Sequence, residues 1–234
     1  MKTSKTKLNS RGFGHIEFLL LAVVIVIVVG AGMWVWEKNS GPKLTSAQKT
    51  VQTACLKDYN DKRLCDFDAL WITSLAKIPY TMIETGATSS TIKNDGKGNF
   101  SITTTSGDVV SYNSAIYVLA PGISTWVEYA AGSSGAPNIP NPASSFHDLT
   151  VEHSKGYTYA YEGTVKCGSL TCYKFQGNDP TKSGTTAAVW FDTKHYQLQG
   201  GSSKDGSGNT YISVSYNPVT ITAPTPAISS SDLQ

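Results

Sequence analysis

The chain is poor in charge and almost devoid of arginine. Only 15% of its 234 residues are charged, and arginine occurs only at Arg11 and Arg63. The net charge is +2, but four basic residues lie within the first eleven positions, and subtracting them leaves −2 for the rest of the chain. A surface that binds nucleic acid needs clustered positive charge to meet the phosphates. The composition therefore argues against a nucleic-acid partner.

Sequence signatures of catalysis and cofactor binding are also missing. There is no G-x-S-x-G turn to present a nucleophilic serine and no P-loop to hold a phosphate. The four histidines are scattered. His147 and His153 lie near Asp148 and Glu152, but metal sites show tighter ligand spacing, so we interpret these residues as solvated. We expect a protein that is not an enzyme and has no metal or cofactor.

The abundant residues favour a β-rich domain outside the cytoplasm. Glycine (21) and tyrosine (12) are frequent, among many serines and threonines. At this length the chain has room for one membrane segment and one domain that buries a real core. A second full domain is not expected.

A long apolar run near the start predicts a membrane helix. Phe18 to Trp36 is nineteen residues without a charge, enough at about 1.5 Å per residue to cross a hydrocarbon core of about 30 Å. Trp34 and Trp36 lie where aromatic residues anchor a helix at the interface. Basic residues precede the run, so the positive-inside rule places the N-terminus in the cytoplasm. We expect a single-pass protein of the cell membrane with an extracytoplasmic domain.

One acidic residue stands at the head of this run. A carboxylate in a membrane helix is costly unless it is paired, so Glu17 indicates a function. The basic leader, Gly12, Phe13, Ile16 and Glu17, followed by an unbroken apolar helix, resembles the type IV prepilin signal. The resemblance implies that a prepilin peptidase cuts between Gly12 and Phe13. It also implies that Glu17 pairs with the amino terminus of a neighbouring pilin-like subunit.

Two other interpretations of the N-terminus stay open. A cleaved signal peptide would have a shorter apolar core, of about 7–15 residues. An uncleaved signal anchor would leave Glu17 at the cytoplasmic interface, in reach of water. Gly41 and Pro42 are expected to end the helix soon after the membrane, which favours a tether over a filament subunit. The expected segments are a leader (residues 1–12), a membrane helix (13–38) and a linker (39–45).

The four cysteines fall into two close pairs. Cys55 and Cys65 are ten positions apart, and Cys167 and Cys172 are five apart. Neither spacing suits a zinc site, and outside the cytoplasm thiols form disulfides. Four cysteines permit three connectivities, of which local pairing within each pair is the simplest.

The rest of the chain predicts two short helices followed by many strands. Helices are expected over about 46–58 and 66–75, with Cys55 and Cys65 holding the turn between them. From Tyr80 onward the pattern changes to short alternating runs separated by turn residues, an α+β pattern with an antiparallel sheet or open barrel. The eleven runs are YTMIET, TIKND, NFSITTT, VVSY, AIYVLA, STWVEYA, TCYKFQ, TAAVWFDT, YQLQGGSS, TYISVSY and PVTIT.

Three loops carry further predictions. Asp95–Asn99 and Asp205–Asn209 have nearly the same text, and we expect hairpin turns there, because the repeated carboxylates of a calcium loop are missing. Between the two groups of strands, SSFHDL predicts one or two helical turns.

The order of these elements resembles the LolA/LolB-like family of lipoprotein carriers. The phrases AIYVLAPGISTWVEY and VWFDTKHYQLQG look like that family's paired strand motifs, and the likeness covers about residues 46–222, leaving 223–234 as a tail. The resemblance implies a half-open β-barrel, closed by short helices, that binds apolar ligands. The aromatic and apolar residues that we expect to line its pocket, unless they are ordinary core residues, are Trp71, Met82, Tyr117, Trp126 and Trp190.

Together these features predict a membrane-anchored, extracytoplasmic and non-catalytic binding module. Its expected ligand is a lipid, an acyl chain or a lipoprotein. The alternative is a minor pilin or pseudopilin, a structural subunit of a type IV filament or secretion system. A mature N-terminus at Phe13 and recovery in sheared filaments would distinguish the second function from the first.

Overall fold

The computed structural model describes residues 42–233, apart from 87–88, 134–135, 138, 140–141, 143–148, 181–184 and 207. The expected leader and membrane helix, with Gly12, Phe13 and Glu17, lie outside the described residues. Among the helices that are described, none has the length and apolar character needed to span a membrane.

The described chain is mostly β-strand with a few short helices. The helical segments are α2 (Ser46–Tyr59), α3 (Lys62–Leu70), α4 (Leu149–Ser154) and the 3-10 helices η2 (Ile72–Lys77) and η4 (Ser230–Leu233). The strands are β1 (Tyr80–Gly86), β2 (Ser90–Asn94), β3 (Phe100–Thr104), β4 (Gly107–Tyr112), β5 (Ala115–Leu119), β6 (Trp126–Tyr129), β7 (Thr158–Cys167), β8 (Leu170–Asn178), β9 (Thr186–Asp192), β10 (Leu198–Asp205), β11 (Gly208–Ser215) and β12 (Ala227–Ser229).

Helix α2 begins and ends at sequence signals. The Gln48 amide donates to the Thr45 hydroxyl (3.3 Å), and the Thr45 amide donates to Gln48 Oε1 (3.0 Å), which makes a capping box. The helix ends at Asn60, whose φ of 52° places it in the left-handed region. The helix predicted over 46–58 is therefore confirmed.

The bounds predicted for the second helix are wrong. Helix α3 begins at Lys62, because the carboxylate of Asp61 accepts hydrogen bonds from the amides of Arg63 (2.9 Å) and Leu64 (3.2 Å) and so caps it. The helix ends before the predicted stretch is complete, and the chain continues as the 3-10 helix η2.

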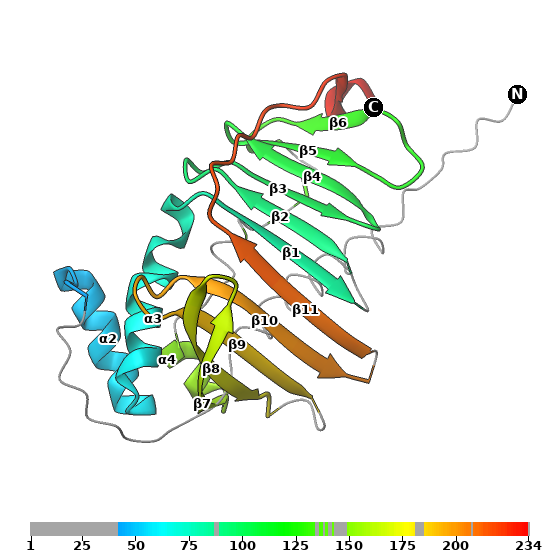
Figure 1. Ribbon diagram of the computed structural model, residues 1–234. Helices are drawn as coiled ribbons and strands as arrows, with labels where there is room; N and C mark the ends of the chain where they lie inside the picture. The colour runs from blue at the N-terminus through cyan, green and yellow to red at the C-terminus, as the bar shows by residue number, and fades with distance from the viewer. Residues whose placement is uncertain are drawn as a thin grey trace, which may run out of the picture.

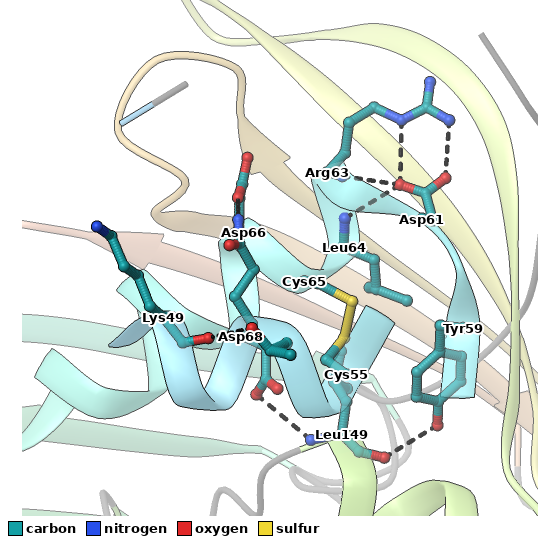
Figure 2. The surroundings of a disulfide bond; sticks show 12 residues. Lys49, Cys55, Tyr59, Asp61, Arg63, Leu64, Cys65, Asp66, Asp68 and Leu149 are labelled. Carbon is teal, nitrogen blue, oxygen red and sulfur yellow. Dashed lines mark hydrogen bonds and ion pairs between the residues drawn. A yellow bond between two sulfur atoms is a disulfide. The ribbon is translucent and has the colours of Figure 1, made fainter. Parts of the chain in front are cut away.

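Both cysteine pairs form disulfides within the pair, which confirms the simplest connectivity. The bond between Cys55 and Cys65 joins α2 to α3 in the interior (Figure 2). Tyr59 donates to the Leu149 carbonyl (3.1 Å), and the Leu149 amide donates to Asp68 (3.3 Å). Helix α4 is thereby tied to the α2–α3 pair. It begins at Leu149, the last residue of SSFHDL, and the rest of that predicted helical segment lies outside the described residues.

The twelve strands of the described residues belong to one open sheet. Their order is β12-β6-β5-β4-β3-β2-β1-β11-β10-β9-β8-β7, so the two groups of consecutive strands meet where β1 pairs antiparallel with β11. Helices α2, α3 and α4 lie at the β7–β10 end of the sheet, and β2–β6 extend away from them (Figure 1). The predicted sheet of antiparallel strands is confirmed as an open one.

The strand predictions differ from the structure in PVTIT, in β7 and, as described below, in β12. The segment PVTIT, residues 218–222, was predicted as a strand but pairs with no other strand. Strand β7 was not predicted, although it pairs with β8 along its whole length. The register of β7 shifts between Tyr161 and Gly163, and this bulge interrupts the alternation by which a strand is recognised.

The last residues of the chain take part in the sheet. Strand β12 pairs in parallel with β6, with Ile228 opposite Val127. The segment 223–234, expected to be a tail, therefore contributes an edge strand.

The turn at Asp95 is a hairpin turn, as predicted. It connects β2 to β3, and Gly96 and Gly98 take φ values of 73° and 99° that favour glycine. The Asp95 carboxylate accepts hydrogen bonds from the amides of Lys97 (2.7 Å) and Asn99 (3.1 Å) and from the Asn99 side chain (2.7 Å). The Asp95 carboxylate is therefore hydrogen-bonded within its own turn.

The helices pack on the sheet through aromatic rings. Phe67 of α3 stacks between Trp71 and Phe191 of β9, with ring centroids 5.3 Å and 4.4 Å away. One face of β7–β10 is therefore covered by helices.

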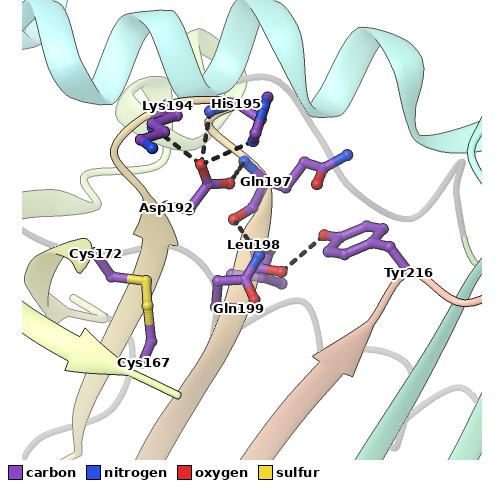
Figure 3. A network of polar contacts seen from close by, with 9 residues as sticks. All are labelled: Cys167, Cys172, Asp192, Lys194, His195, Gln197, Leu198, Gln199 and Tyr216. Atoms are coloured by element: carbon purple, nitrogen blue, oxygen red, sulfur yellow. Dashed lines mark hydrogen bonds and ion pairs between the residues drawn. A yellow bond between two sulfur atoms is a disulfide. The ribbon is translucent and has the colours of Figure 1, made fainter. Parts of the chain in front are cut away.

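The turn from β9 into β10 is held by a buried carboxylate. Asp192 accepts hydrogen bonds from three backbone amides, those of Lys194, His195 and Gln197 (Figure 3).

Candidate functional site

The face of the sheet that packs against the helices continues across the other strands as an apolar surface. Side chains of directly paired residues lie on the same face, so the register identifies a single row that crosses eight neighbouring strands. We call it the inner row. It consists of Val214, Met82, Ile92, Ile102, Val109, Val118, Val127 and Ile228.

Exposure along the inner row rises toward one edge of the sheet. Met82 is 1% exposed in the middle of the sheet, whereas Val118 is 8% exposed, Val127 is half-buried and Ile228 is 39% exposed. The row therefore connects the core to an accessible edge without a polar residue in between. An apolar ligand can reach the row at its open end, at Val127 and Ile228, because the protein already covers the residues from Met82 to Val118.

A second row of the inner face is polar. Glu84 lies opposite Ser90, which in turn lies opposite Thr104. Glu84 and Ser90 are both buried, and the Ser90 hydroxyl donates to the Glu84 carboxylate (2.9 Å). Because Glu84 is two residues from Met82 on β1, this polar row runs beside the inner row and borders it.

Tyrosine hydroxyls lie at the junction between the helices and the sheet. Trp71 Nε1 donates to the Tyr216 hydroxyl (2.8 Å), which donates to the Leu198 carbonyl (2.7 Å). Burial raises the pKa of Tyr216 and of Tyr80 above the ordinary value of a phenol. Both phenols are therefore neutral, and the Tyr216 hydroxyl links the helix end to β10 as a neutral hydrogen-bonding group.

The structure does not bring the five predicted lining residues together. Met82 belongs to the inner row, and Trp71 is buried at the end of α3. Tyr117 and Trp126 lie on the opposite face of β5 and β6, since Val118 and Val127 occupy the inner row. Trp190 also lies on that opposite face, between the buried Val189 and Phe191.

Sequence reasoning missed most of the inner row because it selected large aromatic residues. The signal that identifies the row is the alternation of aliphatic and polar residues in each strand, for example Ile92 between Thr91 and Lys93. The row becomes visible only when the register is known, because each strand contributes one or two apolar residues.

Within residues 42–233, with the gaps given above, there is no group of three or more histidine, cysteine, aspartate or glutamate side chains able to hold a metal. His195 lies 3.4 Å from Asp192 but is mostly exposed, in the turn after β9.

Comparisons with known proteins give only distant similarity. No family model and no curated protein matches the chain. Among solved structures, it is similar to LprF from Mycobacterium bovis, with 14% identity, 78% of this chain and 100% of that chain covered, and a TM-score of 0.42. It is also similar to the lipoprotein LppX from Mycobacterium tuberculosis, with 14% identity, 74% and 99% covered, and a TM-score of 0.38.

A third similar structure is a LolA superfamily protein from Nitrosomonas europaea. The identity is 8%, the match covers 62% of this chain and 86% of that chain, and the TM-score is 0.22. At TM-scores below 0.5 none of these similarities assigns a function, which has to follow from the geometry of the chain itself.

Proposed function

We propose that this protein is a non-catalytic binding module that holds a lipid, an acyl chain or the lipid part of a lipoprotein along the inner row. The observation that carries the proposal is the unbroken apolar row from the core to an accessible edge of the sheet. In finer terms, we propose a LolA-like carrier domain, a half-open barrel with the helices at one end.

The dimensions and energetics of the row suit a long apolar chain. Seven steps between neighbouring strands, at about 4.8 Å each, span at most about 34 Å. Each methylene group that leaves water contributes about 0.8 kcal/mol to binding. A ligand gains this contribution along the open end of the row, at Val127 and Ile228, since the residues from Met82 to Val118 are already buried.

The ligand's polar end has a place beside the row. Glu84, Ser90 and Thr104 form the polar border of the inner row. Glu84 and Ser90 are buried and bonded to each other, which leaves the half-buried Thr104 as the member of this border that the head of an amphiphile can reach.

We further propose that residues 13–38 anchor the module in the cell membrane, with residues 1–12 in the cytoplasm and the sheet outside. The nineteen uncharged residues from Phe18 to Trp36 and the basic leader support this arrangement. The two disulfides fit an oxidising compartment. Protease added to intact spheroplasts should digest the outer domain and leave a short membrane fragment.

Lipid analysis of the purified protein tests the proposed function. The full chain, extracted from membranes in amphipol and analysed by native mass spectrometry, should carry an excess mass that organic extraction identifies as an amphiphile. A single unliganded mass, together with no uptake of added long-chain fatty acid, would contradict the proposal.

A minor pilin or pseudopilin is the second candidate function. Glu17 at the head of the apolar run, after Gly12 and Phe13, favours it. Under this function the mature protein begins at Phe13 and is recovered in filaments sheared from the cell surface. Recovery in the membrane fraction alone, with an intact leader, counts against it.

A further inference from the structure

We propose that the opposite, outer face of the sheet carries a second site, which binds an acidic saccharide. A shallow depression of about 200 Å³ opens on strands β8–β11, on the face that turns away from the inner row. We call it the outer depression. The lining side chains that the proposal uses are Gln176, Ala188, Ser202, Lys204, Asn209 and Tyr211.

The sheet register aligns these side chains in two adjacent rows. In the first row Gln176, Ala188, Ser202 and Tyr211 lie opposite one another in turn, across four neighbouring strands. In the second row Lys204 lies opposite Asn209. Since Ala188 and Ser202 are small, they leave a low floor between the larger side chains at the two ends of the first row.

Aromatic rings border this floor. Tyr211 is 55% exposed, although it is a large side chain in the middle of a strand. Trp190, two residues from Ala188 on β9, lies over Gly200, where an added Cβ would be 2.8 Å from its Nε1 atom. Glycine at position 200 thus makes room for the indole beside the outer depression.

The combination of side chains fits a sugar ring. A pyranose presents C–H groups on its faces, which pack on aromatic rings, and hydroxyl groups at its edges. The amides of Gln176 and Asn209 can each both donate and accept, as paired hydroxyl groups require. The volume is below the roughly 300–1,000 Å³ of pockets for drug-sized ligands, so it suits one sugar unit of a longer chain.

Charge selects an acidic sugar. Of the nine residues that line the outer depression, Lys204 is the one with a charged side chain. An ammonium group at the rim attracts a carboxylate or sulfate on the sugar and no neighbouring lining residue opposes it. An apolar chain is a poorer occupant, because it would leave the amides and hydroxyls of the lining without partners.

Isothermal titration of the full chain in amphipol tests the site. The probes are an oligogalacturonate, a hyaluronan tetrasaccharide and the neutral chitotetraose. We expect at least one acidic probe to bind, Tyr211→Ala to weaken that binding at least tenfold, and Lys204→Gln to weaken it about tenfold while abolishing the preference over chitotetraose.

Two matched variants on the same face serve as controls. Tyr112→Ala on β4 and Lys93→Gln on β2 remove the same groups away from the outer depression and should leave binding unchanged. Failure of all three probes to bind, or equal losses in the control variants, overturns the proposal. Uptake of fatty acid along the inner row should be the same in all four variants, so the two sites can fail separately.

Discussion

At the scale of single residues, buried polar groups and close approaches decide where the chain turns and packs. Asp61, Asp95 and Asp192 each accept hydrogen bonds from at least two backbone amides at the start of a helix or in a tight turn. These carboxylates order loops and take no part in the proposed binding. Their burial therefore has a structural reason, and they are not candidates for catalytic acids or bases.

Asp95 should make stability depend on pH in the acid range. Burial alone would raise the pKa of Asp95, but hydrogen bonds from the Asn99 side chain and from the amides of Lys97 and Asn99 hold it below its ordinary value. Its stabilising contribution is complete above the unfolded pKa of about 3.9 and is lost as the pH falls through the lower, folded value. Thermal unfolding should show that Asp95→Asn loses less stability than the wild type on acidification.

Gly200 should not tolerate a side chain. A Cβ there would lie 2.5 Å from the Ile212 carbonyl oxygen and 2.8 Å from Trp190 Nε1. We expect Gly200→Ala to lower the free energy of unfolding by about 1–3 kcal/mol. Gly206→Ala, in the neighbouring turn with open space around its Cβ, should stay within about 0.5 kcal/mol. Equal effects in urea titrations would show that Trp190 does not lie over Gly200.

At the scale of elements, the alternation of polar and apolar side chains predicts most of the strands of the sheet. It fails for β7 and for the segment 218–222. Ten of the eleven predicted runs are strands, because their polar and apolar residues alternate between two faces. The bulge at Tyr161 and Gly163 hides β7, and a run with β-branched residues at 218–222 imitates a strand although nothing pairs with it. Helix α3 was misplaced because the cap at Asp61 outweighed the apolar periodicity farther along.

The candidate site was predictable only in part. The resemblance to the LolA/LolB-like family implied an apolar ligand, but the inner row depends on which residues face each other across strands far apart in the sequence. No periodicity within one strand contains that information. Tyr117, Trp126 and Trp190 were chosen for size, and the register places them on the other face.

The two disulfides should differ in their contribution to stability. Cys55–Cys65 joins two helices that are otherwise connected through a short turn, whereas Cys167–Cys172 closes the end of the β7–β8 ladder. We expect Cys55→Ala with Cys65→Ala to cost about 2–4 kcal/mol in denaturant unfolding. The paired change of Cys167 and Cys172 should cost clearly less, because the ladder already holds that hairpin. The reverse order would contradict this assignment.

At the scale of the whole molecule, one sheet separates two surfaces of different chemistry. The inner face continues from the helix-covered core to an accessible apolar edge, and the outer face presents amides, hydroxyls and Tyr211. Under the two proposals, one side of the sheet holds an amphiphile and the other side a saccharide. The two proposals are independent, since they rest on opposite faces of the same strands.

Photo-crosslinking tests the central claim most directly. Cells that express the full chain are fed a long-chain fatty acid with a diazirine near its tail, irradiated, and the crosslinked residues are mapped by mass spectrometry. The labels should fall on the open end of the inner row at β5, β6 and β12, that is on Val118, Val127 and Ile228.

A matched pair of variants completes this measurement. Val127→Trp fills the accessible part of the inner row and should lower the crosslinking yield at least tenfold, whereas Val110→Trp, on the outer face of β4, should leave it unchanged. Labels confined to residues 13–38, or equal yields in the two variants, would contradict an apolar ligand on the inner face of the sheet.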